Sequence, residues 1–280
     1  MQPGRPSRTA LGAALHRAAH QVLEGGSIFA DPLALRILGP GAEDKARASD
    51  PDGARQRLRL FIAFRSRLVE EALIAAFDQG VRQVVILGAG LDTLAHRNPR
   101  PGALRVFEAD HPATQAWKRE LLAAAGMADP GGLAYVPVDF ERDALADCLV
   151  GAGFDPGAPA FFSWLGVVPY LTEEAIFGTL GWIAALRGGA RVVFDYGNPP
   201  AAGEALEAGR RDLARRVAAA GEALKTSFET PVLHARLGVL GFQVLEDCGP
   251  VAMRRRFRPG PGEAGTDHGG HVVVAASLPA

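Results

Sequence analysis

Cysteine is scarce in this sequence. Its 280 residues include only two cysteines, Cys148 and Cys248, and neither belongs to a zinc-ligand pattern with its neighbours. We therefore expect no metal site. Isolated thiols are typical of proteins from a reducing compartment, so the cysteine content favours a cytoplasmic protein.

Long hydrophobic segments are also missing. No window of the length needed to cross a bilayer is free of charged residues. The first twenty residues lack the apolar core of a signal peptide, because His16, Arg17 and His20 interrupt them. We expect a protein with no membrane partner.

The sequence has no excess of charge of either sign. It contains 30 lysines and arginines against 31 aspartates and glutamates, so its net charge is −1. Such a balance provides no long-range attraction to nucleic acid or to an anionic membrane. The expected partner is a small molecule or a local protein surface. Composition leaves the oligomeric state open, a homodimer included.

The first eighty residues have helical patterns. The predicted helices are Ser7–Leu23, Asp31–Leu38 and Gln56–Phe77. Ser7 or Thr9 is expected to cap the first of them, and Asp31 with the following proline begins the second. The polar residues 41–54 are predicted to be a loop. We expect residues 1–80 to form a helical N-terminal extension.

From residue 81 onward, short apolar runs alternate with helical segments. The run Gln83–Leu87 is continuous, which is typical of a strand buried on both faces of a sheet. The next predicted strands are Leu104–Ala109, Ala134–Val138, Ala160–Leu165 and Arg191–Tyr196, with helices Pro112–Ala125, Arg142–Val150 and Thr172–Leu186 between them. This alternation predicts an α/β domain over residues 81–280, with a mostly parallel sheet covered by helices on both faces.

The alternation breaks after the fifth strand. Residues 199–230 contain a charged helical segment, Ala201–Ala220, which we predict to be a lid inserted into the domain. The remaining predicted elements are the helix Pro231–Leu240 and the strands Phe242–Asp247 and His271–Ala276. The residues 253–270 between those strands are predicted to be a loop.

A glycine turn, Gly88-Ala89-Gly90, follows the first strand. Glycines in such a turn allow positive φ angles and a close approach of the backbone to a ligand. A dinucleotide site would need a third glycine where Thr93 stands, and the Gly-Lys-Ser/Thr of a phosphate loop is absent. Asp92 would repel a phosphate. The turn therefore favours a ligand without a pyrophosphate, although a tight turn without any ligand is an equal alternative.

Acidic residues follow the next two strands. Asp110 lies 22 positions after Gly88, where α/β nucleotide sites place a carboxylate that accepts hydrogen bonds from ribose hydroxyls. Asp139 and Phe140 follow the third strand, and a carboxylate beside an aromatic ring can hold an adenine. Each acid has a simpler alternative as a helix cap. The three strand ends together favour a nucleoside site.

Several ordered segments resemble the leucine carboxyl methyltransferase superfamily of class I S-adenosylmethionine (SAM) dependent methyltransferases, in its bacterial small-molecule branch. The resemblance covers nearly the whole chain. The segments that carry it are "SRTALGAALHRAAH", "FADPLALRILG", "VVILGAGLDTLAHR", "FEADHPATQAWKRE", "YVPVDFERD" and "SWLGVVPYLTEE". The resemblance implies a Rossmann-like sheet of seven strands, with the last strand antiparallel.

The resemblance also implies a set of site residues. The expected cofactor-binding residues are Arg65, Gly88, Ala89, Gly90, Asp110, Asp139, Phe140 and Ser163. Among them, Arg65 resembles the family arginine that holds the SAM carboxylate. Arg17 and Tyr170 are the candidate catalytic residues. Many relatives have a glutamate where this chain has Leu165, so a contact made by that glutamate cannot be transferred.

The predicted function is O-methylation by SAM, with S-adenosylhomocysteine (SAH) as the product. A carboxylate acceptor is ionised at neutral pH and needs no base, whereas a phenol with a pKa near 10 usually needs one. His111 and His16 are the nearest base candidates, and neither lies in a motif that demands this role. We therefore expect a small-molecule carboxylate of secondary metabolism. A hydroxyl acceptor and a SAM-binding protein without catalysis are the alternatives.

Overall fold

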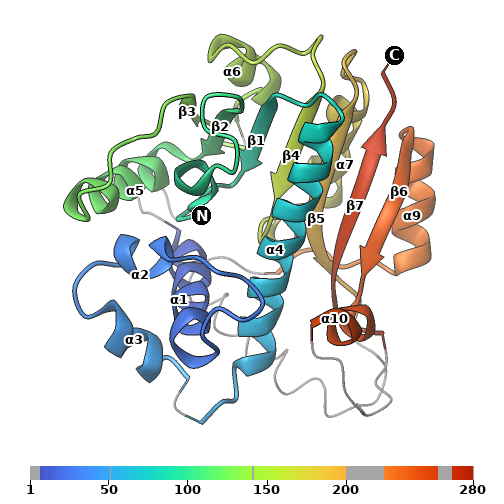
Figure 1. The fold of residues 1–280 in the computed structure, drawn as a ribbon. Helices are drawn as coiled ribbons and strands as arrows, with labels where there is room; N and C mark the ends of the chain where they lie inside the picture. The colour runs from blue at the N-terminus through green and yellow to red at the C-terminus, as the bar shows by residue number, and fades with distance from the viewer. Residues whose placement is uncertain (1–6, 51, 141, 200–223, 258–266, 280) are drawn as a thin grey trace. The chain divides into compact units, whose positions relative to one another are not determined.

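Seven β-strands alternate with helices and form a mixed sheet, as the sequence pattern predicts. The computed structural model describes residues 7–50, 52–140, 142–199, 224–257 and 267–279. Its backbone divides into an N-terminal unit of residues 2–155 and a C-terminal unit that begins at Pro156. Each unit is described by itself below (Figure 1). The division into a helical extension and a methyltransferase domain at residue 80 stays a prediction.

Four helices begin the N-terminal unit. They are α1 (Arg8–Leu23), α2 (Leu33–Ile37), α3 (Ala42–Ala48) and α4 (Gln56–Asp78). The Ser7 side chain accepts a hydrogen bond from the Ala10 N–H and caps α1, as predicted. The prediction of a loop over residues 41–54 was wrong in part, because α3 lies there. Acidic residues in the first turn of α3 and basic residues in its last turn complement the helix dipole.

The three strands of the N-terminal unit are parallel and lie in the order β3-β2-β1. They are β1 (Gln83–Leu87), β2 (Arg105–Asp110) and β3 (Leu133–Pro137), with α5 (Pro112–Ala124), α6 (Leu145–Gly151) and the short helix η1 (Leu94–Arg97) between or after them. In the register, Leu87 is level with Ala109, and Asp110 is level with Pro137. The residues that follow β1, β2 and β3 therefore lie side by side at one edge of this unit.

The C-terminal unit contains the other four strands, in the order β4-β5-β7-β6. They are β4 (Ala160–Trp164), β5 (Ala190–Gly197), β6 (Phe242–Cys248) and β7 (Gly270–Ser277), with the helices η2 (Val168–Tyr170), α7 (Glu173–Ala184), α9 (Thr230–Val239) and α10 (Pro250–Phe257). β7 is antiparallel to both of its neighbours, which confirms the expected antiparallel last strand. The prediction of a loop over residues 253–270 was wrong in part, because α10 covers its first residues.

The two ends of the predicted lid can be located, although residues 200–223 lie outside the described part of the chain. Asn198, just after β5, donates from its side-chain amide to the Phe228 carbonyl. The Lys225 N–H donates to the Pro169 carbonyl of η2. The described residues on the two sides of this segment, Asn198 and Phe228, therefore lie side by side at the end of β5.

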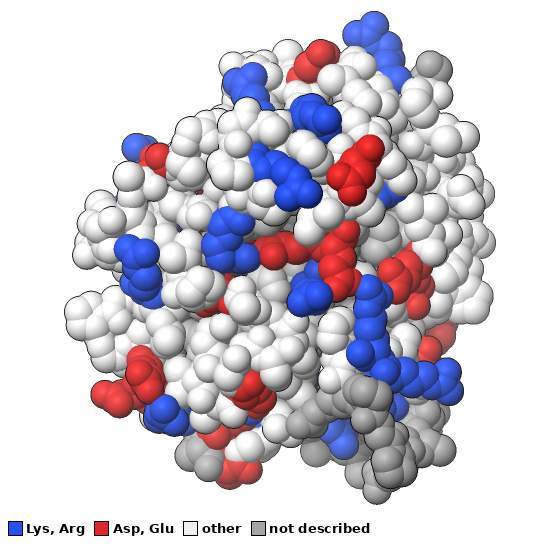
Figure 2. Space-filling model, viewed as in Figure 1, with Lys and Arg blue, Asp and Glu red and all other residues white. Residues whose placement is uncertain are grey.

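Basic and acidic side chains are interspersed on the face shown in Figure 2, in keeping with the near-zero net charge. Arg254, Arg255 and Arg256 are exposed on α10. Within the described ranges, no helix is both long and apolar enough to cross a membrane.

Candidate functional site

The glycine turn after β1 is held against the next strand. The Gly88 and Ala89 N–H groups both donate to the Ala109 carbonyl, at 2.8 and 3.3 Å. Gly88 and Gly90 have positive φ angles of 67° and 50°, which residues other than glycine rarely adopt. The turn therefore has the backbone that the sequence pattern predicts.

Asp110 fixes the far end of this turn. Its carboxylate accepts a hydrogen bond from the Gly90 N–H at 2.5 Å and another from the His111 N–H at 2.6 Å. The residue is only 9% exposed. Burial raises the pKa of Asp110, although both N–H donors act in the opposite direction. The cap of α5 is His111, whose Nδ1 accepts from the Ala113 N–H and is thereby occupied.

Helix α1 lies directly against Gly90. A Cβ atom added at Gly90 would lie 2.9 Å from the Cβ of Ala10, on the first turn of α1. The Ser7 N–H also donates to the Thr114 hydroxyl of α5 at 3.3 Å. Glycine is therefore required at position 90 because α1 approaches it closely. The sequence did not predict this contact.

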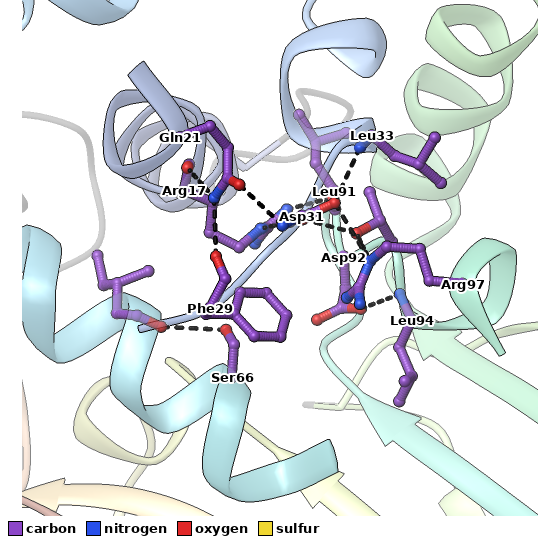
Figure 3. Close-up of polar contacts among 12 residues, drawn as sticks. Arg17, Gln21, Phe29, Asp31, Leu33, Ser66, Leu91, Asp92, Leu94 and Arg97 are labelled. Carbon is purple, nitrogen blue, oxygen red and sulfur yellow. Dashed lines mark hydrogen bonds and ion pairs between the residues drawn. The ribbon is translucent and has the colours of Figure 1, made fainter. Parts of the chain in front are cut away.

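Arg17, on the inner face of α1, donates through Nη2 to the Leu91 carbonyl of the turn at 2.5 Å. Its Nε donates to Asp31 at 3.3 Å. The side chains of Arg17 and Asp31 are 8% and 0% exposed. Figure 3 shows these bonds between α1, the segment before α2 and the turn. The candidate catalytic residue Arg17 thus holds backbone of the glycine turn.

Asp31 is shared by several donors. The Thr93 hydroxyl donates to it at 2.8 Å, and Nε of Arg97 lies 3.2 Å from its other oxygen. Arg97 in turn donates to Glu70 of α4 at 2.5 Å. One network of ion pairs and hydrogen bonds therefore connects α1, the glycine turn, η1 and α4. Figure 3 shows its part around Asp31.

Asp92 lies beside this network. Burial alone would raise the pKa of Asp92, but the positive charges of Arg17, Lys118 and Arg97 and a hydrogen bond from the Leu94 N–H hold it below its usual value. The turn therefore presents a carboxylate, which disfavours a phosphate ligand, as the sequence suggested.

Arg65 and Arg67 of α4 differ in their surroundings. Arg65 is 9% exposed, and its guanidinium lies 5.9 Å from the centre of the Phe61 ring. Arg67 is exposed and pairs with Glu71 at 2.6 Å on the helix surface. Arg65 is therefore a buried residue of α4, whereas Arg67 is a surface residue.

The residues after β3 form a short turn. The Asp139 N–H donates to the Asp143 carboxylate at 2.8 Å, and the side chains of Asp139 and Arg142 lie 3.7 Å apart. Asp139 does not cap α6, whose N-cap is Ala144. The Val138 N–H donates to the Asp110 carbonyl, so this turn is tied to the end of β2. Phe140 is half-buried.

A buried ion pair stabilises the strand that carries Asp110. Lys118 of α5 lies 2.6 Å from Glu108 of β2, and each side chain is 1% exposed. Burial raises the pKa of Glu108, while Lys118 acts to lower it. Both residues stand in the quoted motif "FEADHPATQAWKRE", but their pairing across two elements was not predicted.

The remaining predicted residues lie in the C-terminal unit. Ser163 of β4 is 2% exposed, and Tyr170 of η2 is half-buried beside the Pro169 carbonyl that accepts from the Lys225 N–H. Leu165 is partly buried just after β4. Tyr170 thus directly follows the residue whose carbonyl accepts from Lys225.

A cluster around Asp247 of β6 was missed by sequence reasoning. Its carboxylate lies 2.6 Å from Nε2 of His234, 2.7 Å from the Tyr196 hydroxyl and 2.8 Å from Nδ1 of His271. The His234 side chain is 34% exposed, whereas that of His271 is 6% exposed. The three partners come from α9, β5 and β7. These elements lie too far apart along the chain for a local sequence pattern to indicate the cluster.

Most of the N-terminal unit and the first part of the C-terminal unit match a known protein family. Residues 10–184, more than half of the chain, match the family model described as leucine carboxyl methyltransferase. The chain belongs to the leucine carboxyl methyltransferase family. The match runs from α1 to the end of α7, and it includes the glycine turn and the ends of β2, β3 and β4.

Two curated relatives support the same family. YktD of Bacillus subtilis strain 168, whose name proposes a SAM-dependent methyltransferase, is 34% identical over 189 residues, which are 66% of this chain and 62% of YktD. A Mycobacterium avium strain 104 protein, whose name proposes the same activity, is 37% identical over 182 residues, 60% of this chain and 57% of that protein. The chain spans about three fifths of the length of these relatives.

Solved structures share the fold of this family member. A proposed methyltransferase of Thermobifida fusca YX aligns with a TM-score of 0.57 and 18% identity over 99% of this chain and 96% of that one. A DUF574 family protein of Streptomyces avermitilis aligns with a TM-score of 0.51 and 17% identity over 94% of this chain and 97% of that one. The predicted seven-stranded, Rossmann-like class is confirmed.

The Asp247 cluster predicts a pH window of stability. Burial acts to lower the pKa of His271, but Asp247 raises it above 6.5 overall. Protonated His271 therefore contributes to the free energy of unfolding below pH 6.5, and this contribution is lost as the pH rises through the raised pKa. Burial acts to raise the pKa of Asp247, but its three partners bring it below 3.8. Ionised Asp247 therefore contributes to the free energy of unfolding above pH 3.8, and this contribution is lost as the pH falls through the lowered pKa.

Asp247→Asn should therefore lower the free energy of unfolding by about 2 kcal/mol near pH 5, and by less near pH 9. Calorimetric unfolding across this pH range measures the difference, with the exposed Asp78→Asn as control. An equal loss at both pH values would contradict the assigned charge coupling.

Proposed function

We propose that this protein is a SAM-dependent O-methyltransferase that acts on a small-molecule carboxylate. One observation carries the proposal: the glycine turn, Asp110 and the Asp139-Phe140 pair lie at one edge of three parallel strands, in the order that the family resemblance implies. In open α/β sheets, ligands bind beyond the carboxyl ends of the strands.

The residues at this edge fit the parts of SAM. Each oxygen of the Asp110 carboxylate accepts one backbone N–H and retains a second lone pair for a ribose hydroxyl. The Asp139 side chain, whose carboxylate lies 3.7 Å from Arg142, is 31% exposed. This carboxylate would accept from an adenine amine, and Phe140 would lie against the base. Arg65, Gly88, Ala89 and Gly90 would hold the methionine part. Ser163, in the C-terminal unit, remains a prediction from the family resemblance.

The chemistry requires alignment more than acid–base assistance. SAM would supply its methyl group to the acceptor oxygen, and the C–S electron pair would remain on the neutral thioether SAH. The protein must hold the nucleophile in line and exclude water. A carboxylate acceptor is already ionised at neutral pH, so the protein needs no base for it. Tyr170 is the proposed donor that would position this acceptor.

A hydroxyl acceptor is the second candidate, and within the C-terminal unit one histidine has the surroundings of a general base. His234 lies 2.6 Å from Asp247 and is partly exposed. A histidine oriented by a carboxylate is a common general base. His111 does not fit this role, because its Nδ1 accepts from the Ala113 N–H and caps α5.

Asp110→Asn should weaken SAM binding by tenfold to a hundredfold, because hydrogen bonds to a charged acceptor contribute about 1.5–3 kcal/mol. Calorimetric titration of SAM measures the dissociation constant. Glu120→Gln, an exposed acid on α5, is the matched control and should bind like the wild type. Unchanged affinity in Asp110→Asn would remove the ribose assignment.

Incubation of the protein with SAM and candidate metabolic acids should yield a product carrying one additional methyl group, detected by mass spectrometry. A base-labile product identifies a methyl ester and a carboxylate acceptor. A base-stable product, together with a rate that increases through neutral pH, would favour the hydroxyl acceptor. SAM binding without transfer to any acceptor would favour a non-catalytic SAM-binding protein.

A further inference from the structure

We propose that helix α1 forms a wall of the cofactor site and that Arg17 is a positioning residue for the glycine turn. Binding of SAM and docking of α1 would then be coupled. This inference rests on the proposed SAM site, and it replaces the prediction that Arg17 is a catalytic residue.

The first support is the contact between α1 and the turn. Ala10 lies so close to Gly90 that a Cβ atom there would be 2.9 Å from the alanine methyl group. Gly90 is the same residue whose N–H donates to Asp110. A displacement of α1 would therefore release the backbone that orients the proposed ribose-binding carboxylate.

The second support is the hydrogen bonding of Arg17. Its guanidinium donates to the Leu91 carbonyl, one residue after Gly90, and to the Asp31 carboxylate. Both side chains of the ion pair are buried, at 8% and 0% exposure. Loss of Arg17 would free the Leu91 carbonyl and leave Asp31 with Arg97 as its ion-pair partner. Loss of Asp31 would remove the buried ion pair of Arg17.

The third support is the extent of the network. Asp31 also accepts from Thr93, three residues after the turn, and pairs with Arg97, which donates to Glu70 of α4. Arg65, the proposed partner of the SAM carboxylate, is on the same helix, little more than one turn before Glu70. One network, buried at Arg17 and Asp31 and partly buried at Arg97 and Glu70, therefore connects the glycine turn to the helix of Arg65.

The shape of the guanidinium matters for this role. Arginine presents several donors in a planar fork, and here that fork serves a carbonyl and a carboxylate at once. A lysine at position 17 keeps the charge but cannot reproduce both contacts with the same geometry. Arg17→Lys should therefore retain the fold and part of the affinity, whereas Arg17→Met should lose more.

The experiment compares SAM binding by the wild type, Arg17→Lys, Arg17→Met, Asp31→Asn and the double variant of Arg17→Met with Asp31→Asn. Arg47→Met is the control, because it removes an exposed ion pair with Glu43 on the neighbouring helix α3. Each dissociation constant is measured by calorimetry, well below the unfolding temperature of the variant. We expect at least tenfold weaker binding for Arg17→Met, an intermediate loss for Arg17→Lys and a change under twofold for Arg47→Met.

The double variant tests whether the two residues act as a unit. If they do, it should bind SAM about as weakly as Arg17→Met alone. Should Arg17→Met fail to fold, the folded Arg17→Lys variant decides the question by itself. Folded variants that bind SAM within twofold of the wild type would overturn the inference, even if their unfolding temperatures fell. A wild type that binds neither SAM nor SAH would instead contradict the proposed function, and this inference with it.

Discussion

The N-terminal unit depends on the buried ion pair between Arg17 and Asp31. Two charges removed from water are tolerated only where each has its partner and further hydrogen bonds. Here Asp31 has Arg97 and Thr93 as additional partners, and Arg17 has the Leu91 carbonyl. These requirements permit few arrangements of α1, the glycine turn and α4. The network therefore explains how a short helical segment near the N-terminus can shape a turn more than seventy residues later.

Asp110 connects this network to the proposed chemistry. The parallel register brings the end of β2 beside the glycine turn, where the Asp110 carboxylate accepts the Gly90 N–H. The same carboxylate retains acceptor capacity for a ribose. It thus holds the turn in the free protein and would hold a ligand in the complex. Glu108, two residues before Asp110 on β2, forms a buried ion pair with Lys118 of α5. This pair stabilises the strand that carries Asp110.

Much of this arrangement could be predicted from local sequence, because strands, caps and turns follow from neighbouring residues. β1 begins and ends as predicted, Ser7 caps α1, and the glycine turn has positive φ angles. The helix α3 was missed, since its few apolar residues resemble those of a loop. The bonds of Arg17 with Leu91, and of Asp247 with His271, join residues far apart in the chain. Such pairings arise from tertiary packing, which a single sequence does not encode in any local pattern.

The central claim is that the glycine turn is the floor of a SAM site and that α1 is one of its walls. Hydrogen–deuterium exchange of the wild-type protein, with and without saturating SAH, tests it most directly. Slower exchange is expected on addition of SAH in two segments together, the glycine turn with Leu91 and helix α1, Arg8–Leu23. Unchanged exchange in either segment, with SAH demonstrably bound, would contradict it.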